Sequence, residues 1–245
     1  FFHLNSAESE SLFFDVLLHL GTLIAVFIGY REEILSLLRE IPAMLRGKPS
    51  PAGKAGGIAN RRMMLLVVLG TLPLFLILPI KDRVESLYNN TIFIGAALLV
   101  TGVLLYFSDR IGHGSKTERN ATVGDALLVG VSQAIATVPG LSRSGTTISA
   151  GLCCGFSRNF AVKFSFFLSI PAVLGANLLS LIDAISAGIN WSMMPKYLAG
   201  VLAAMVVGYL CIRLLKRLAQ RGGFGYFAYY CWGVGAITLI LSLIR

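Results

Sequence analysis

The stretch TVPGLSRSGTTISAGL, residues 137–152, interrupts an otherwise apolar part of the chain. It contains one arginine, three serines, three threonines and three glycines where a membrane helix would carry leucines. Pro139 disfavours the helical conformation at Val138, so a helix is expected to end there. We therefore predict two half-helices, over about 122–138 and 145–156, that meet at an irregular turn. Such a re-entrant hairpin, over about 122–156, is tolerated at membrane depth only where it is buried in protein or lines a wet cavity.

The composition of the whole chain places this hairpin in a membrane. Of the 245 residues, 56% are hydrophobic and 13% are charged, whereas soluble domains carry about 25% charged residues. Continuously apolar runs favour helices that cross the bilayer. The sequence predicts an all-α, polytopic helical membrane protein, whose further spans cover about 13–30, 63–80, 92–107, 160–182, 197–212 and 224–244.

The net charge of +9 is explained by membrane topology and does not indicate a nucleic-acid partner. If the loop over 31–62 is cytoplasmic and the hairpin enters and leaves on one side, sixteen of the 21 basic residues lie in cytoplasmic segments. This bias agrees with the positive-inside rule. Arg143 is the one basic residue that the topology does not explain, because the outer side accounts for the other four, Lys81, Arg83, Lys196 and Arg245.

We expect residues 1–245 to form a single integral-membrane domain. A cytoplasmic loop over about 46–61 is rich in glycine and proline and is expected to be flexible. No initiator methionine precedes Phe1, so the sequence is interpreted as truncated at its N-terminus. The four cysteines lie in apolar segments without metal-ligand spacing, which favours a packing role.

Arg143 is the first candidate for a functional residue. An arginine at membrane depth is costly and marks a site with an anionic partner. Its guanidinium group can bind carboxylate or phosphate through two hydrogen bonds, and Ser142 and Ser144 flank it with hydroxyl groups. The alternative is that Arg143 extends to the interface while the serines satisfy the main chain of a kink.

The residues around this arginine favour an oxyanion site. Gly140 and Gly145 allow main-chain N–H groups to approach a ligand closely. Ser144 is expected to cap the helix that follows, with Thr146 and Thr147 in its first turn. The free N–H groups and the positive end of the helix dipole would then face the same place as the guanidinium group. Transporters also aim broken helices at anions, so these features do not by themselves indicate catalysis.

Three other polar residues are expected inside the membrane. Asp15 and His19 lie four residues apart on one face of the first span and could orient a proton carrier. A satisfied polar pair near the end of a helix explains them equally well. Gln133 precedes the turn, and hydrogen bonding within the helix bundle is the simpler explanation for it than a role in catalysis.

The motif PGLSRSGTTISAGL resembles that of the undecaprenyl-diphosphate phosphatase family, the bacitracin-resistance membrane phosphatases. GVSQAIATV before it and FSRNFAVKFSFFLSIPAVLGA after it carry the same resemblance, as does FFDVLLHLGTLIAV near the start. The resemblance extends over essentially the whole chain. It implies removal of the terminal phosphate from undecaprenyl diphosphate, which recycles the lipid carrier for peptidoglycan and other envelope polymers.

The resemblance also implies an arrangement and a site. Two re-entrant hairpins would form an inverted repeat, of which this hairpin is one half, with the site open to the periplasmic or outer face of a bacterial inner membrane. Arg143 would grip the diphosphate, Ser142 and Ser144 would position it, and a divalent cation, Mg²⁺ or Ca²⁺, would assist. The expected partners are the polyprenyl diphosphate lipid and the bilayer. Assembly into a homo-oligomer is a further possibility.

The sequence also departs from that family. The family has a second motif, rich in glutamate and serine and ending in histidine, upstream of FFDVLLHLGT, and nothing like it occurs in these residues. The metal ligands and the general base would lie there, so neither serine beside Arg143 can be named the nucleophile. A carrier or flippase for a phosphorylated polyprenyl lipid, using the same anion site, is the alternative function. The unrelated lipid phosphatases with P-S-G-H and S-R-x5-H motifs do not match.

Overall fold

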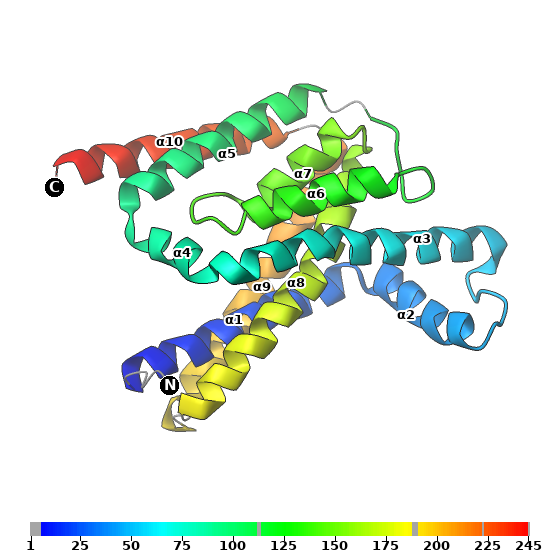
Figure 1. The fold of residues 1–245 in the computed structure, drawn as a ribbon, viewed down its shortest axis with the longest axis horizontal. Coiled ribbons are helices and arrows are strands. Elements are labelled where there is room, and N and C mark those ends of the chain that lie inside the picture. Colours follow the sequence, from blue (N-terminus) through cyan, green and yellow to red (C-terminus); the bar gives the residue numbers. More distant parts are fainter. Residues whose placement is uncertain (1–5, 112–113, 188–190, 222, 245) are drawn as a thin grey trace. The chain divides into compact units, whose positions relative to one another are not determined.

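The computed structural model describes residues 6–111, 114–187, 191–221 and 223–244, and these ranges are almost entirely helical (Figure 1). Within them the structure contains no strand, and its one isolated bridge joins Lys116 to Phe156. The predicted all-α class is therefore confirmed. The helices are α1 (Ser6–Gly29), α2 (Arg31–Leu45), α3 (Gly53–Thr71), η1 (Leu72–Ile80), α4 (Lys81–Ser86), η2 (Leu87–Asn89), α5 (Thr91–Ile111), α6 (Val123–Ile135), α7 (Arg143–Cys153), α8 (Arg158–Ala187), η3 (Trp191–Met193), α9 (Met194–Arg221) and α10 (Phe224–Ile244).

Five helical segments of the described ranges are long and apolar enough to cross a membrane. A sixth candidate is the pair of α1 and α2, which meet at a bend of 88°. The chain is thus a multi-pass membrane protein, as the composition predicts. The five segments are Gly53–Ile80, Thr91–Arg110, Arg158–Ile182, Met194–Leu218 and Gly225–Ile244.

The chain divides into two compact units. The first comprises residues 1–38 and 169–215, and the second comprises residues 39–168 and 216–245. Three helices, α2, α8 and α9, contribute residues to both units. The motif around Arg143 lies wholly in the second unit.

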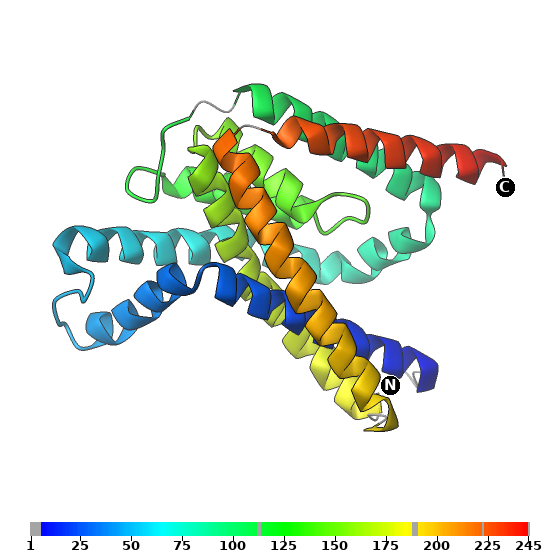
Figure 2. The ribbon, with the colours of Figure 1, turned by 180° about the vertical axis from the view of Figure 1, so that it is seen from behind.

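In the first unit, α1 packs side by side with α9 through small residues (Figure 2). A Cβ atom on Gly21 would lie 2.7 Å from the main-chain oxygen of Val201, and one on Gly200 would lie 2.5 Å from the ring of Phe14. Close approach of two helices through glycine is typical of membrane bundles. The buried ring of Phe13 meets that of Tyr197 edge to face, with 5.3 Å between their centroids.

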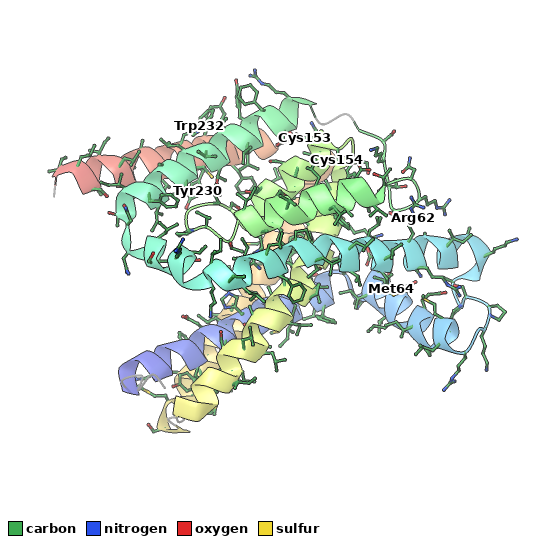
Figure 3. The ribbon with its side chains drawn as sticks, viewed as in Figure 1. Arg62, Met64, Cys153, Cys154, Tyr230 and Trp232 are labelled. Carbon is green, nitrogen blue, oxygen red and sulfur yellow. The ribbon has the colours of Figure 1, made fainter. Side chains whose placement is uncertain are left out.

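In the second unit, α5 and α10 lie side by side along most of their length (Figures 1 and 2). The indole Nε1 of Trp232 donates a hydrogen bond of 3.1 Å to the main-chain oxygen of Leu99 (Figure 3). A Cβ atom on Gly102 would lie 2.4 Å from the same indole ring, so only glycine admits it there. Thus α10 holds α5 in place.

The predicted span over 63–80 ends at Ile80 as observed, but the observed span differs in the geometry of its last part and in its start. It becomes a 3-10 helix from Leu72 onward, where Pro73 cannot donate a hydrogen bond. It also begins earlier, because α3 starts at Gly53. The expected loop over about 46–61 is therefore reduced to residues 46–52, and its alanines and arginines extend the helix instead.

Candidate functional site

The hairpin forms as the motif predicts, with α6 and α7 separated by the turn over residues 136–142. A capping box begins α6: Asp125 N–H donates to the Thr122 hydroxyl, and Thr122 N–H donates to the Asp125 carboxylate. The α6 helix passes α3 at Gly130, where a Cβ atom would lie 2.1 Å from the main-chain oxygen of Gly70. This close crossing fixes α6 against α3, the first helix of the span Gly53–Ile80.

Polar contacts fix the end of the hairpin that lies away from the turn. Lys116 binds the Asp125 carboxylate at 2.9 Å, and its main chain bonds to Gly155 and Ser157 on either side of Phe156. On α3, Arg62 donates a 2.7 Å hydrogen bond to the Ala121 oxygen, and its position is seen in Figure 3. Both helices of the hairpin are therefore anchored where the chain enters and leaves it.

The N-cap of α7 is Ser142, and the expectation that Ser144 caps this helix is wrong. Ser142 has an extended main chain, and its Oγ accepts a 3.2 Å hydrogen bond from Gly145 N–H. Its main-chain oxygen accepts from Thr146 N–H at 2.8 Å. The helix starts two residues earlier than expected because Ser142, and not Ser144, has the non-helical conformation that a cap requires.

This cap leaves Arg143 and Ser144 as the first two residues of α7. Their N–H groups precede the first intrahelical hydrogen bonds, and no contact with an acceptor is found for them in the part of the chain that the structure describes. The positive end of the helix dipole adds to this partial charge. The start of α7 is therefore a site suited to an anion.

Arg143 is itself the first residue of α7. Arg143 is half-buried, and no carboxylate of the described residues lies within ion-pair distance of it. Its electrostatic neighbour is the phenol of Tyr88, in η2. A cation without a carboxylate partner at membrane depth favours an anionic ligand over an internal ion pair.

The predicted binding residues that follow are buried in α7. Gly145 donates to the cap, and the Thr146 hydroxyl finds no partner among the described residues. Thr147 donates to the Arg143 oxygen at 2.9 Å and lies 2.6 Å from the Ser165 hydroxyl on α8. Thr147 thus ties the first turn of α7 to its neighbour, whereas Thr146 keeps its hydroxyl free for another group.

Gln133 is fully buried in α6, and neither end of its amide has a partner within the described ranges. Hydrogen bonding within the bundle, the simpler explanation from the sequence, is not what the structure shows for this side chain. A buried amide without partners is costly, so Gln133 is available for a water molecule or a ligand.

Asp15 and His19 belong to the first unit and are exposed. His19 Nδ1 lies 2.8 Å from the main-chain oxygen of Asp15, so the contact between these residues does not involve the carboxylate. Among the described residues, no group of three or more histidine, cysteine, aspartate or glutamate side chains could hold a metal ion.

Sequence analysis missed Thr101, a fully buried residue of α5. Its Oγ1 lies 3.2 Å from the main-chain nitrogen of Ser142 and 3.3 Å from the main-chain oxygen of Gly140. The only signal in the sequence is a single threonine within the apolar run GAALLVTGVLLY. That signal is weak, because a threonine in a membrane helix can satisfy its hydroxyl on its own helix.

The amino-acid sequence is similar to one protein family and to several individual proteins. Residues 1–237 match the family described as "Bacitracin resistance protein BacA". An undecaprenyl-diphosphatase of Methanosphaera stadtmanae is 37% identical over 238 residues, which cover 95% of this chain and 85% of the relative. One from Methanobrevibacter smithii is 40% identical, with 96% and 85% covered. One from Desulfosudis oleivorans is 38% identical over 246 residues, with 98% and 88% covered.

Proposed function

Because the chain belongs to the bacitracin resistance protein BacA family, we propose that it hydrolyses undecaprenyl diphosphate to undecaprenyl phosphate and inorganic phosphate. The resemblance drawn from the P-G-L-S-R-S-G turn is confirmed over nearly the whole chain. The product is the lipid carrier of cell-wall synthesis, so the enzyme recycles that carrier. The observation that carries the proposal is that Arg143, at the N-terminus of α7, has no carboxylate within ion-pair distance among the described residues.

The proposed chemistry uses the turn as the binding site for the diphosphate. Arg143 grips the phosphate oxygens, and the N–H groups of Arg143 and Ser144 donate to them. Ser142 and Ser144 position the head group, and the apolar helices accommodate the isoprenoid tail. Charge develops on the phosphoryl oxygens and the leaving oxygen during transfer, and donors fixed in advance stabilise it more than they stabilise the ground state.

We expect Arg143→Ala to reduce phosphate release from undecaprenyl diphosphate by about 10²–10³-fold or more, because one preorganised donor is worth that much. Arg143→Lys should recover only part of the activity, since an ammonium group lacks the planar fork. The measurement is inorganic phosphate released by the full-length protein in lipid nanodiscs.

Arg31→Ala provides the matched control, because Arg31 is exposed and its contact with Glu32 is 3.9 Å long. Activity of Arg143→Ala close to that of Arg31→Ala would refute the assignment. If the wild-type protein binds the lipid diphosphate without releasing phosphate, the chain is a carrier or flippase, which is the alternative function.

The proposal extends to orientation, cation and assembly. We place the protein in the bacterial inner membrane with the turn toward the periplasmic or outer face, on the support of the basic residues around 31–62. Family resemblance supports a dependence on Mg²⁺ or Ca²⁺, and no step above is routed through it. Treatment with EDTA followed by either ion tests that dependence, and light scattering tests for a homo-oligomer.

A further inference from the structure

We propose that Thr101 is a positioning residue of the site: its hydroxyl holds the turn over residues 140–142 in the conformation that aims Arg143 and the N-terminus of α7 at the diphosphate. This inference rests on the proposed function. Thr101 lies on α5, far from the motif in sequence, and it would not contact the substrate.

The hydrogen bonds of Thr101 are matched to the capacity of one hydroxyl group. Its Oγ1 accepts from Ser142 N–H at 3.2 Å. Its single proton is directed to the oxygen of Ala97 at 3.1 Å or of Gly140 at 3.3 Å. The hydroxyl therefore contacts the main chain on both sides of Leu141, immediately before Arg143.

Removing this hydroxyl would leave Ser142 N–H without an acceptor. Ser142 is the N-cap of α7, so its main chain sets the direction in which the helix starts. The space that the Thr101 hydroxyl leaves is buried, so the N–H group that points into it would lack a partner there, and an unsatisfied N–H group is costly. The turn would relax to satisfy that group and would carry Arg143 with it.

Other contacts show that α5 also supports Gly140 of the turn and the middle of α7. Gly140 lies so close that a Cβ atom would be 2.5 Å from the Ile94 oxygen and 2.8 Å from the Ala97 Cβ. Further along the same face of α5, the hydroxyl of Ser108 lies 2.9 Å from that of Ser149 on α7. The face formed by residues 94, 97, 101 and 108 follows the helical repeat.

A purely local role for Thr101 is the competing explanation. Threonine side chains on membrane helices often bond to the main-chain oxygen four residues earlier. Thr238 on α10 does this with Val234 at 2.8 Å and has no contact with the motif. It is therefore the matched control for a threonine whose hydroxyl serves only its own helix.

The experiment compares Thr101→Val, Thr101→Ser and Thr238→Val in the full-length protein in nanodiscs. We expect Thr101→Val to lower kcat for phosphate release from undecaprenyl diphosphate by about tenfold to about a hundredfold. The change in KM should be smaller, since misaligned donors lose more of the transition state than of the ground state. Thr101→Ser, which restores the hydroxyl, should return kcat to within about threefold of wild type.

Wild-type kinetics in Thr101→Val would overturn the proposal, as would a loss that Thr101→Ser does not rescue or that Thr238→Val reproduces. If Thr101→Val does not accumulate in the membrane, Thr101→Ala replaces it under the same criteria, and its unfolding temperature is recorded beside its activity. If the wild-type protein itself releases no phosphate, the proposed function fails. The inference is then judged on binding of the lipid diphosphate, which Thr101→Val should weaken and Thr238→Val should not.

Discussion

Gly140 is the residue where the turn depends most on the absence of a side chain. Its φ is +88°, a left-handed conformation that costs other residues about 1–2 kcal/mol. The Ile94 oxygen also occupies the space of a Cβ atom. The glycine was predicted as a point of ligand approach, and the structure shows that it also allows the turn to approach α5.

We expect Gly140→Ala to lower the free energy of unfolding by at least about 1–2 kcal/mol. The same variant should also release less phosphate than the wild type, because a displaced turn moves Arg143. Thermal unfolding and activity are measured on the same nanodisc preparation. Gly233→Ala on α10 is the control, since a Cβ atom there meets nothing within 4 Å. That substitution should be neutral or stabilising by up to about 1 kcal/mol. Equal effects of the two variants would contradict this explanation.

At the scale of elements, a buried carboxylate links the end of α2 to α3. Glu40 is fully covered, and its carboxylate accepts hydrogen bonds from the Ser50 hydroxyl and from Arg61 Nε, the latter at 2.7 Å. Glu40 lies near the end of α2, and Arg61 lies in the first half of α3. The hydrogen bonds from Ser50 and then Arg61 hold the pKa of Glu40 below its ordinary range, although burial opposes them.

A lowered pKa means that the ionised carboxylate stabilises the fold. This contribution is complete above the ordinary pKa of glutamate, about 4.3, and is lost as the pH falls through the lower pKa of the folded protein. The unfolding temperature of wild type should therefore drop below about pH 4.3 more steeply than that of Glu40→Gln. Glu32→Gln, at an exposed site of α2, should keep the wild-type profile, and parallel curves for all three proteins would refute this role.

The helices themselves were largely predictable, whereas their junctions were not. Apolar composition and Pro139 predicted the hairpin, because both act through the local chain. The start of α7 was misplaced because the choice between Ser142 and Ser144 as cap depends on the conformation of the turn, which α5 holds. The short connection over 46–52 also went unpredicted, since Glu40 and Arg61 are distant in sequence.

At the scale of the whole molecule, the distribution of basic residues predicts orientation. We expect a membrane-impermeant maleimide to label Asn89→Cys, but not Lys48→Cys, in intact cells that express a variant without the four native cysteines. Both positions are exposed, so access depends on the side of the membrane. Opening the cells should make Lys48→Cys reactive, and the reverse pattern would invert the proposed topology. Two of the native cysteines, Cys153 and Cys154, lie where α7 ends (Figure 3). Both are free thiols that the maleimide could label, so they are replaced before the new cysteines are introduced.

The sequence by itself determined the membrane class, the spans, the broken helix and Arg143 as an unexplained charge, because composition and local breakers act within one segment. Only the tertiary structure decided that Ser142 caps α7 and that Thr101 supports the turn. It also decided that the Gln133 amide and the Thr146 hydroxyl have no hydrogen-bond partner within the described ranges. Thr101 and Ser142 are 41 residues apart. A contact of that kind depends on which helices pack together, and a local sequence pattern does not predict that packing.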